Sequence, residues 1–295
     1  MNVAANAAAV EAENARREEE LRALAHSTFL PDYLQGPLDP SRMELTAQER
    51  QWALDVKEAV EGLPDLDNVT DFMYAQIALV TQGDLEKAVE RAYILQGFRE
   101  EFDFRDNFEQ GKVALDRFVR RHPGYILHFF FDGQRYLVVH DVTKFDITCV
   151  NSHEEAKQML CGAFYTFHAI HPDLEAVRKG SLYIMECEGY LWKAPKMVNF
   201  RIFRMGFQDI MAVYPLNLYK MRFCNTGVLI NTLTSMVRKY IPASIHSKFE
   251  LGYQSEVRLD TICLVPNVEV ATDRVVREMN ESLKRRYLAE ASFRL

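Results

Sequence analysis

The sequence lacks the motifs that mark the common enzyme classes. No glycine-rich turn follows a predicted strand, so the phosphate cradles of dinucleotide-binding and P-loop proteins are missing. No GxSxG or HExxH motif occurs, so a serine esterase, a lipase or a zinc hydrolase is not indicated. The net charge of -7 provides no broad basic surface of the kind that binds nucleic acids. We therefore predict a protein that is not an enzyme and has no nucleic-acid partner.

The cysteines and histidines do not form a recognisable disulfide framework or metal site. The five cysteines are widely spaced, and no CxxC pair occurs among Cys149, Cys161, Cys187, Cys224 and Cys263. His168 and His171 lie three residues apart near Asp173, a spacing that would place ligands on one side of a helix. No second ligand pair of comparable spacing follows. We expect reduced thiols, no metal and no cofactor.

Long apolar runs and targeting signals are also missing from the sequence. Runs such as Tyr136 to Val139 have the length of a strand and are far shorter than the roughly 20 residues that cross a bilayer. Residues 1–25 are rich in alanine, glutamate and arginine and contain no apolar core of a signal peptide. These features predict a cytoplasmic protein. Since 48% of all residues are hydrophobic, the chain can form a sizeable core.

The N-terminal part of the chain has the pattern of a helical module. Thr46 is followed three residues later by Glu49, which is the spacing of a capping box at a helix N-terminus. Gly83 interrupts the helical pattern, and Asp84 can start the next helix. We assign residues 1–45 to a flexible or helical lead and residues 46–120 to an N-terminal helical module.

Strands begin after this module. The pair Asp132-Gly133 predicts a hairpin turn between strands at residues 125–131 and 135–140. A second capping box at residues 152–155 predicts a helix that Pro172 ends. This alternation of strands and long helices is typical of an α/β fold.

Two further strands and a C-terminal helix complete the predicted architecture. The strands at residues 181–187 and 219–224 are separated by a long helix, which predicts a parallel crossover. We assign residues 121–252 to one α/β domain. Residues 253–295 contain a further predicted strand and a charged amphipathic helix at 272–288, which we expect to pack across the outside of that domain.

A series of short motifs lies in order along the chain. Gly180 and an apolar strand precede Glu186-Cys187-Glu188-Gly189-Tyr190. The other motifs are Asp84 to Ala88, Tyr214-Pro215, Lys220, Asn225 and Lys248 to Gly252. Together these motifs resemble those of the CRAL-TRIO lipid-binding domain family, over roughly residues 46–252. The chain departs from the family pattern at Gln76, where the family usually carries an arginine.

The resemblance implies a mixed or parallel sheet flanked by helices that enclose an apolar pocket. The implied ligand is a hydrophobic small molecule or a phospholipid, which the protein transfers or presents between membranes. Apolar residues at helical spacing or on one strand face are expected to line the pocket. They are Phe164, Phe167, Leu182, Ile184, Phe203, Phe207, Ile210 and Phe223.

The resemblance also implies a gate helix at about residues 228–240. Its apolar face consists of Val228, Leu229, Leu233, Met236 and Val237. We expect this face to enter a membrane surface transiently, so that the protein is cytoplasmic with peripheral membrane association. Basic residues are expected to contact head groups or anionic lipids, at about 1 kcal/mol for each cation. They are Arg201, Arg204, Lys220, Arg222, Arg238 and Lys239.

The same patterns permit other interpretations. Aromatic residues at helical spacing are also typical of an ordinary packed core, and basic residues are typical of a solvated helix face. Besides the lipid carrier, two functions therefore remain open. One is a protein-interaction scaffold that kept the fold and lost its ligand. The other is a lipid hydrolase, which would need a nucleophile and a base within hydrogen-bond reach in the pocket.

Overall fold

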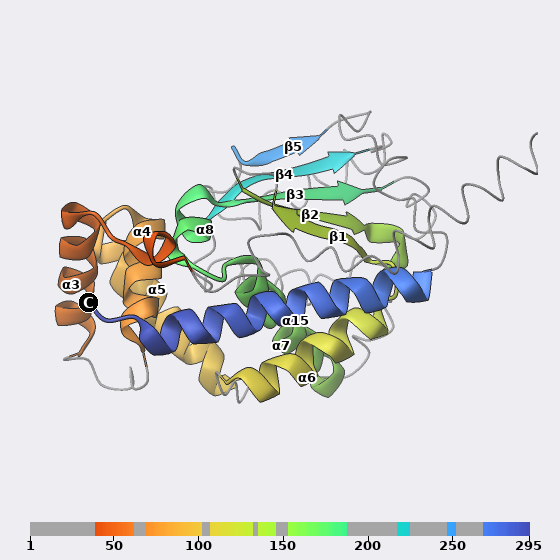
Figure 1. The fold of residues 1–295 in the computed structure, drawn as a ribbon, viewed down its shortest axis with the longest axis horizontal. Helices are drawn as coiled ribbons and strands as arrows, with labels where there is room; N and C mark the ends of the chain where they lie inside the picture. Colours follow the sequence, from red (N-terminus) through yellow and green to blue (C-terminus); the bar gives the residue numbers. More distant parts are fainter. Residues whose placement is uncertain are drawn as a thin grey trace, which may run out of the picture.

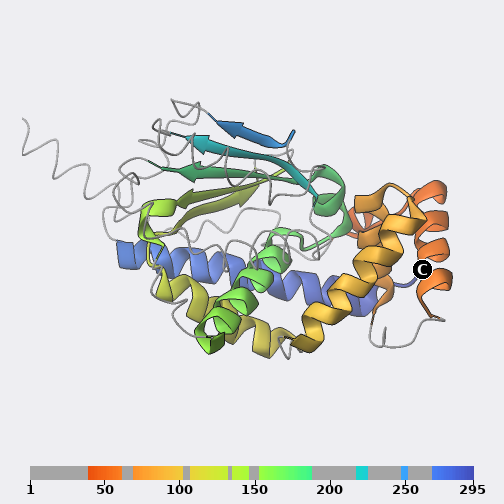
Figure 2. The ribbon, with the colours of Figure 1, turned by 180° about the vertical axis from the view of Figure 1, so that it is seen from behind.

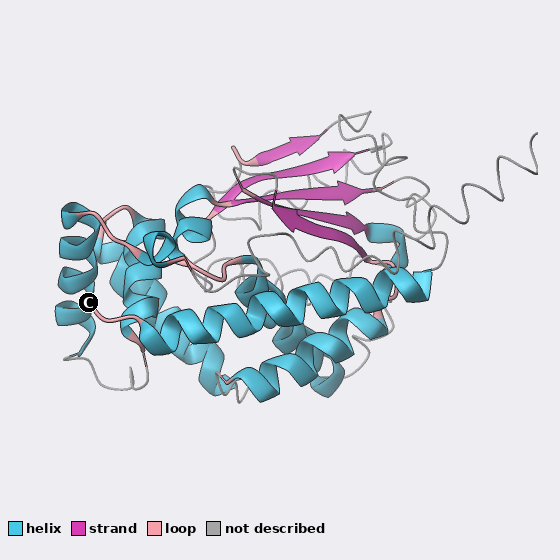
Figure 3. Cartoon of the chain, in the orientation of Figure 1, coloured by secondary structure: helices cyan, strands magenta, loops and turns pink. Residues whose placement is uncertain are grey.

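The computed structural model describes residues 39–61, 69–101, 107–131, 135–145, 153–187, 217–224, 247–251 and 268–295. Long helices lie along one side of a five-stranded sheet, and a group of N-terminal helices lies at one end of it (Figures 1 and 3). The predicted strand between residues 255 and 265 and the long helix before the strand at 219–224 lie outside the described residues.

The N-terminal group consists of a short 3-10 helix and three α-helices. They are η1 (Pro40–Met43), α3 (Ala47–Glu61), α4 (Asp71–Thr81) and α5 (Leu85–Glu101). The predicted capping box begins α3: the Glu49 N–H donates to Thr46 Oγ1 at 3.2 Å, and the Thr46 N–H donates to Glu49 Oε2 at 2.8 Å. This prediction is confirmed.

The turn between α4 and α5 depends on a glycine. Gly83 has φ +78°, and a Cβ placed there would lie 2.4 Å from Trp52 Nε1 of α3. Asp84 then begins α5, because its Oδ1 accepts the Lys87 N–H at 3.2 Å. The predicted break at Gly83 and restart at Asp84 are both confirmed.

The remaining elements form the sheet and its covering helices. They are α6 (Phe108–Arg121), β1 (Ile126–Phe131), β2 (Tyr136–Asp141), η2 (Val142–Lys144), α7 (His153–Ile170), α8 (Leu174–Lys179), β3 (Ser181–Glu186), β4 (Leu218–Cys224), β5 (Phe249–Leu251) and α15 (Val268–Ser292). The strand order is β1-β2-β3-β4-β5. The hairpin pair β1 and β2 is antiparallel, whereas β2, β3, β4 and β5 run parallel. The predicted hairpin, the parallel pairing of the two later strands and the mixed α/β fold class are confirmed.

Helix α15 belongs to the core of the protein. Val275, Met279 and Leu283 are buried in the main apolar cluster, so the apolar side of this amphipathic helix packs against the rest of the domain. The helix lies along α6 and α7 on one side of the sheet (Figure 2).

Helix α15 carries a buried arginine that contacts Gln76 of α4. The guanidinium of Arg286 is fully buried, and its Nη2 donates to Oε1 of Gln76 on α4 at 3.1 Å. Its Nη1 donates to the backbone carbonyl of His171 at 3.1 Å, and its charge lies over the Phe72 ring at 4.9 Å. Arg286 therefore joins α15 to α4 and to the end of α7.

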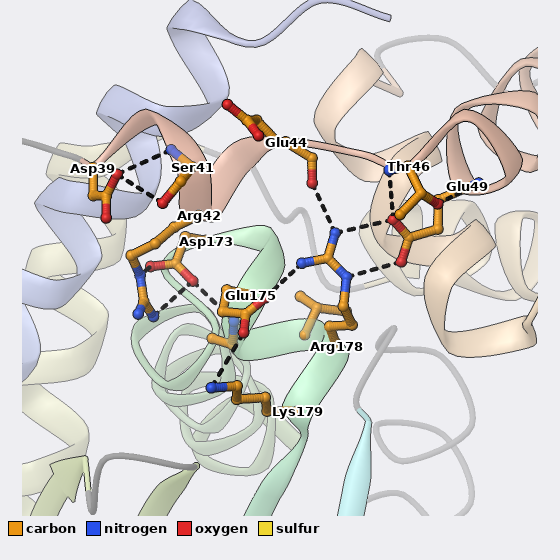
Figure 4. Close-up of polar contacts among 12 residues, drawn as sticks. Asp39, Ser41, Arg42, Glu44, Thr46, Glu49, Asp173, Glu175, Arg178 and Lys179 are labelled. Atoms are coloured by element: carbon orange, nitrogen blue, oxygen red, sulfur yellow. Dashed lines mark hydrogen bonds and ion pairs between the residues drawn. The ribbon is translucent and has the colours of Figure 1, made fainter.

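Ion pairs attach the N-terminal segment to α8 (Figure 4). Arg42 Nε donates to Oδ2 of the fully buried Asp173 at 2.6 Å, and Arg42 Nη2 donates to Asp173 Oδ1 at 3.0 Å. Asp173 also caps α8 by accepting the Ala176 N–H at 2.9 Å. Beside it, Arg178 binds Glu49 at 2.8 Å and Glu175 at 2.6 Å. These contacts fix the helical module against the strand β3 that follows α8.

Candidate functional site

The two faces of the sheet differ in what covers them. Val138, Tyr183 and Met221 are register partners on neighbouring strands and share the face toward α7 and α15, where they belong to the main apolar cluster. We call this the helix-covered face. Val139, Leu182 and Ile184 point to the opposite side, which we call the distal face.

The helix-covered face is filled by tightly packed side chains. Phe164 of α7 is fully buried in the same cluster as Tyr183, and Phe223 stacks on Phe249 at 5.7 Å. Helices α6 and α7 approach so closely that a Cβ on Gly162 would lie 2.3 Å from Cβ of Phe118. The interface between α6 and α7 is therefore closely packed.

The distal face combines an apolar patch with a charged strip. Its apolar patch consists of Leu137, Val139, Leu182, Ile184 and Cys224, which form a cluster of their own. The exposed fraction is 9% at Leu182, whereas it is 0% at Ile184. The residues of the patch belong to β2, to β3 and to the last position of β4.

The charged strip lies beside this patch on the two outer strands. Lys220 and Arg222 of β4 are the register partners of Leu182 and Ile184, so they lie on the same face. Both cations bind Glu250 of β5, Arg222 through Nε at 2.6 Å from Oε2. The hydrogen bond from Lys220, followed by that from Arg222, holds the pKa of Glu250 below its usual value. The distal face thus changes from apolar to ionic within one strand spacing.

The structure divides the residues that were expected to line one pocket. Phe164, Phe167 and Phe223 lie with the helix-covered face, whereas Leu182 and Ile184 lie on the distal face. These two groups cannot line the same cavity, because the sheet separates them. The other expected lining, gate and head-group residues lie outside the described residues: Phe203, Phe207, Ile210, Val228, Leu229, Leu233, Met236, Val237, Arg201, Arg204, Arg238 and Lys239.

Four residues of the distal face were not singled out from the sequence. They are Leu137, Val139, Cys224 and Glu250. The apolar run that forms β2 was visible in the sequence, but the strand that lies beside each strand of a parallel sheet was not. The strand register places Leu137 opposite Leu182 and Arg222 opposite Glu250. These two pairs define the distal face.

Comparison with known proteins adds one similarity at this point. The chain is similar to the crystal structure of Sfh5. The two share 13% sequence identity with a TM-score of 0.49, over 72% of this chain and 82% of Sfh5. No family model and no curated protein matches the sequence. The fold class stated above rests on the strand order and the parallel pairing of this chain.

One serine and histidine pair within the described ranges has the spacing of a nucleophile and its base. Ser181 Oγ lies 3.0 Å from His171 Nε2, and His171 Nδ1 lies 3.0 Å from the backbone carbonyl of Phe167. Both side chains have an exposed fraction of 0%. The pair links the end of α7 to the start of β3, away from the distal face, and provides no open route for a substrate.

The described ranges also lack the features of a metal centre and of a membrane-spanning helix. No group of three His, Cys, Asp or Glu side chains there is arranged to hold a metal. Cys161, Cys187 and Cys224 are free thiols, and burial raises the pKa of Cys161 to about 11 and that of Cys187 to about 12. No described helix combines the length and apolar composition needed to cross a bilayer.

Two buried histidines predict that acid weakens the fold. Burial lowers the pKa of His140 and of His171 from 6.5 to about 3, with a further lowering at His171 by the charge of Arg286. Unfolding restores the ordinary pKa, so their neutral forms contribute stability above about pH 6.5 that is lost as the pH falls toward 3. We expect urea unfolding to give a free energy about 2–3 kcal/mol lower at pH 5.5 than at pH 7.5.

The substitution His140→Phe provides the control for this pH dependence. Neither ring nitrogen of His140 has a hydrogen-bond partner, and the ring stacks on Tyr183 at 5.7 Å, so a phenyl ring can take its place. The variant should lose about half of the pH dependence. Equal stability of the parent protein at the two pH values would contradict the burial of neutral histidines.

Proposed function

We propose that this protein binds a hydrophobic, lipid-type molecule on the distal face of its sheet and transfers or presents it between membranes. The observation that carries the proposal is the apolar patch around Leu182 and Ile184, bordered by the strip of Lys220, Arg222 and Glu250 on the same face. An amphiphile has this same division into an apolar chain and a polar head group. The motif resemblance to the CRAL-TRIO family supports the same ligand class.

Burial of a hydrocarbon chain provides the affinity for such a ligand. Each methylene removed from water contributes about 0.8 kcal/mol, so one long chain offsets the cost of association without any covalent step. Few polar anchors are then needed. The strip supplies one net positive charge, because two cations share the single carboxylate of Glu250. This charge favours an anionic or zwitterionic head group over β4 and β5.

Exchange of the ligand requires a segment that opens. We assign this role to the segment at residues 228–240, whose apolar residues would enter the membrane surface while Arg238 and Lys239 meet anionic lipids. Leu233→Asp places a charge in that apolar series. Transfer of lipid between liposomes should fall strongly in this variant, and an unchanged transfer rate would contradict the role of the segment.

Identification of lipid in the purified protein tests ligand binding itself. The recombinant protein is passed through a sizing column, extracted with organic solvent and analysed by mass spectrometry. We expect one class of lipid to be enriched at close to one molecule per chain. Val113→Ser and Leu288→Ser serve as matched controls, because these side chains are 58% and 59% exposed and lie on helices away from the distal face. They should retain the lipid.

The absence of any lipid from the parent protein, even after incubation with mixed lipid vesicles, would contradict the proposal that it carries a lipid. The fold would then be left with the role of an interaction scaffold. Loss of lipid in the two serine variants would also count against the proposal, because it would show that the lipid adheres to the outer helix surface.

A further inference from the structure

An arginine and a tyrosine meet across the start of β3 on the distal face. The guanidinium carbon of Arg135, the residue before β2, lies 3.5 Å from the centroid of the Tyr219 ring on β4. Strand β3 lies between β2 and β4, so this contact passes over β3 (Figure 1). The Nζ atom of Lys220 lies 5.7 Å from the same centroid. Two cations therefore flank one aromatic residue, which is 42% exposed.

A β-bulge places the tyrosine ring on this face. Ser181 of β3 pairs with Leu218 of β4. The next pair joins Leu182 to Lys220, so Tyr219 is an extra residue between the two pairs. Such a bulge redirects a side chain out of strict alternation. The ring consequently lies beside Lys220, whose register partner Leu182 belongs to the apolar patch.

Arg135 reaches the same face from the other side of β3. Leu137 and Val139 of β2 belong to the apolar patch, and Arg135 lies two residues before Leu137, so its side chain starts on that face. A hydrogen bond with Arg135, together with the charges of Arg135 and Lys220, lowers the pKa of Tyr219. The stacked pair thus borders the patch at the end where the parallel strands begin.

The opposite end of the patch carries the opposite charge. Asp141 and Glu186, the last residues of β2 and β3, are register partners, and Glu186 also pairs with Cys224 of the patch. Alternation along the strands places both carboxylates on the distal face. The face therefore has cations at the amino ends of these strands and carboxylates at the carboxyl ends. This polarity favours one orientation of an amphiphile with an anionic head group.

We propose that Arg135, held flat on the Tyr219 ring, anchors the oxyanion of the bound lipid. This inference rests on the lipid-carrier function proposed above and names the head-group chemistry, which is a carboxylate or a phosphate. A guanidinium that stacks through its face still donates through its N–H edge, and its planar fork matches both oxyanions. Tyr219 is a positioning residue, because its ring fixes the plane of the guanidinium. The hydrocarbon chain then lies over Leu182 and Ile184.

The test compares three lipids that share one hydrocarbon chain and differ in the head group. They are oleic acid, oleyl phosphate and oleyl alcohol, each kept below the concentration at which it forms micelles. Displacement of a neutral, pyrene-labelled long-chain alcohol gives the dissociation constant of each lipid. The parent protein should bind oleate, oleyl phosphate or both at least about tenfold more tightly than oleyl alcohol. A preference for oleate alone assigns a fatty acid, and a preference for oleyl phosphate assigns a phosphate head group.

Substitutions of the stacked pair should change this preference and leave the affinity for oleyl alcohol unchanged, since the apolar patch is intact. Arg135→Gln should remove the preference. Arg135→Lys keeps the charge without the planar fork and should retain only part of it. Tyr219→Leu should reduce it several-fold, because the guanidinium is no longer held in place. Tyr219→Phe keeps the ring and should retain most of the preference.

Arg50→Gln and Tyr93→Leu are matched controls for these variants. Arg50 on α3 is exposed, and Tyr93 on α5 is 44% exposed, so each control makes the same kind of change on a helix of the N-terminal module. Both should bind the three lipids as the parent protein does. Urea unfolding of every variant shows whether the fold is kept. A loss of oleyl alcohol binding in Arg135→Gln, with a lower free energy of unfolding, would show a structural role and would overturn the anchor.

The preference for an anion separates this inference from the proposed function. If the parent protein binds the three lipids equally well, or if Arg135→Gln keeps the preference, the anchor is overturned while the carrier function stands. Equal loss of preference in Tyr219→Phe and Tyr219→Leu would contradict the positioning role of the ring. A parent protein that binds neither the labelled alcohol nor any of the three lipids would contradict the carrier function and the anchor together.

Discussion

Phe164→Ala is expected to lower the free energy of unfolding by about 3–5 kcal/mol. Phe164 has an exposed fraction of 0% and lies in the cluster that joins α7 to α15 and the sheet. Removing its ring leaves a cavity among side chains that cannot close around it. Urea unfolding monitored by circular dichroism measures the loss. The amount of lipid per folded molecule should stay the same, because this ring is on the helix-covered face.

Phe167→Ala on the same helix is the matched control. Phe167 is only partly buried against that cluster, so its truncation should cost clearly less than that of Phe164. A loss below about 1 kcal/mol for Phe164→Ala, together with a loss of bound lipid, would contradict this account. It would show instead that Phe164 lines a ligand cavity, as its helical spacing first suggested.

Asp173→Ala is expected to lower the free energy of unfolding by about 3–5 kcal/mol. Asp173 is fully buried, binds Arg42 through two hydrogen bonds and caps α8. The variant leaves Arg42, only 15% exposed, without its counter-charge and removes the cap from the helix that leads into β3. Urea unfolding at neutral pH measures this effect. Limited proteolysis should cut first between η1 and α3, where the N-terminal segment is released from α8.

Asp39→Ala tests whether capping alone explains that loss. Asp39 also caps a helix, since its Oδ1 accepts the Ser41 N–H at 3.0 Å, but it is exposed. Its replacement should leave the unfolding curve nearly unchanged. If the two alanine variants lost similar stability, the ion pair between Arg42 and Asp173 would have no special role in holding the helical module.

Much of the local structure could be predicted because it depends on neighbouring residues. The capping box of Thr46 and Glu49, the turn at Gly83 and the hairpin of β1 and β2 each depend on residues close together in the sequence. Such signals determine where a helix or a strand begins and ends. They contain no information on which distant segment will lie beside it.

The arrangement of the candidate site could not be predicted for the same reason. The aromatic spacing of α7 showed that Phe164 and Phe167 share one side of a helix, but it did not show on which face of the sheet that helix packs. Leu182 lies beside Lys220, and Arg222 beside Glu250, because of the register between parallel strands. Register between parallel strands is set by long connections and by the packing of whole elements.

The buried polar contacts were equally hidden from sequence reasoning. Arg286 lies 210 residues from Gln76 in the sequence, and yet its guanidinium donates a hydrogen bond to the Gln76 side chain. Charge in the sequence is visible, but the presence or absence of a counter-charge depends on the tertiary structure.

The central claim is that the lipid lies on the distal face at Leu182. Leu182→Trp and Leu218→Trp test it as a matched pair, because Leu182 is 9% exposed on the distal face and Leu218 is 2% exposed in the main cluster on the other side. Lipid per folded molecule is measured by extraction and mass spectrometry, with urea unfolding alongside. We predict that Leu182→Trp loses most of the lipid at nearly unchanged stability, whereas Leu218→Trp retains the lipid and loses about 1–3 kcal/mol through overpacking. Full lipid content in Leu182→Trp, or loss of lipid only in Leu218→Trp, would contradict the account.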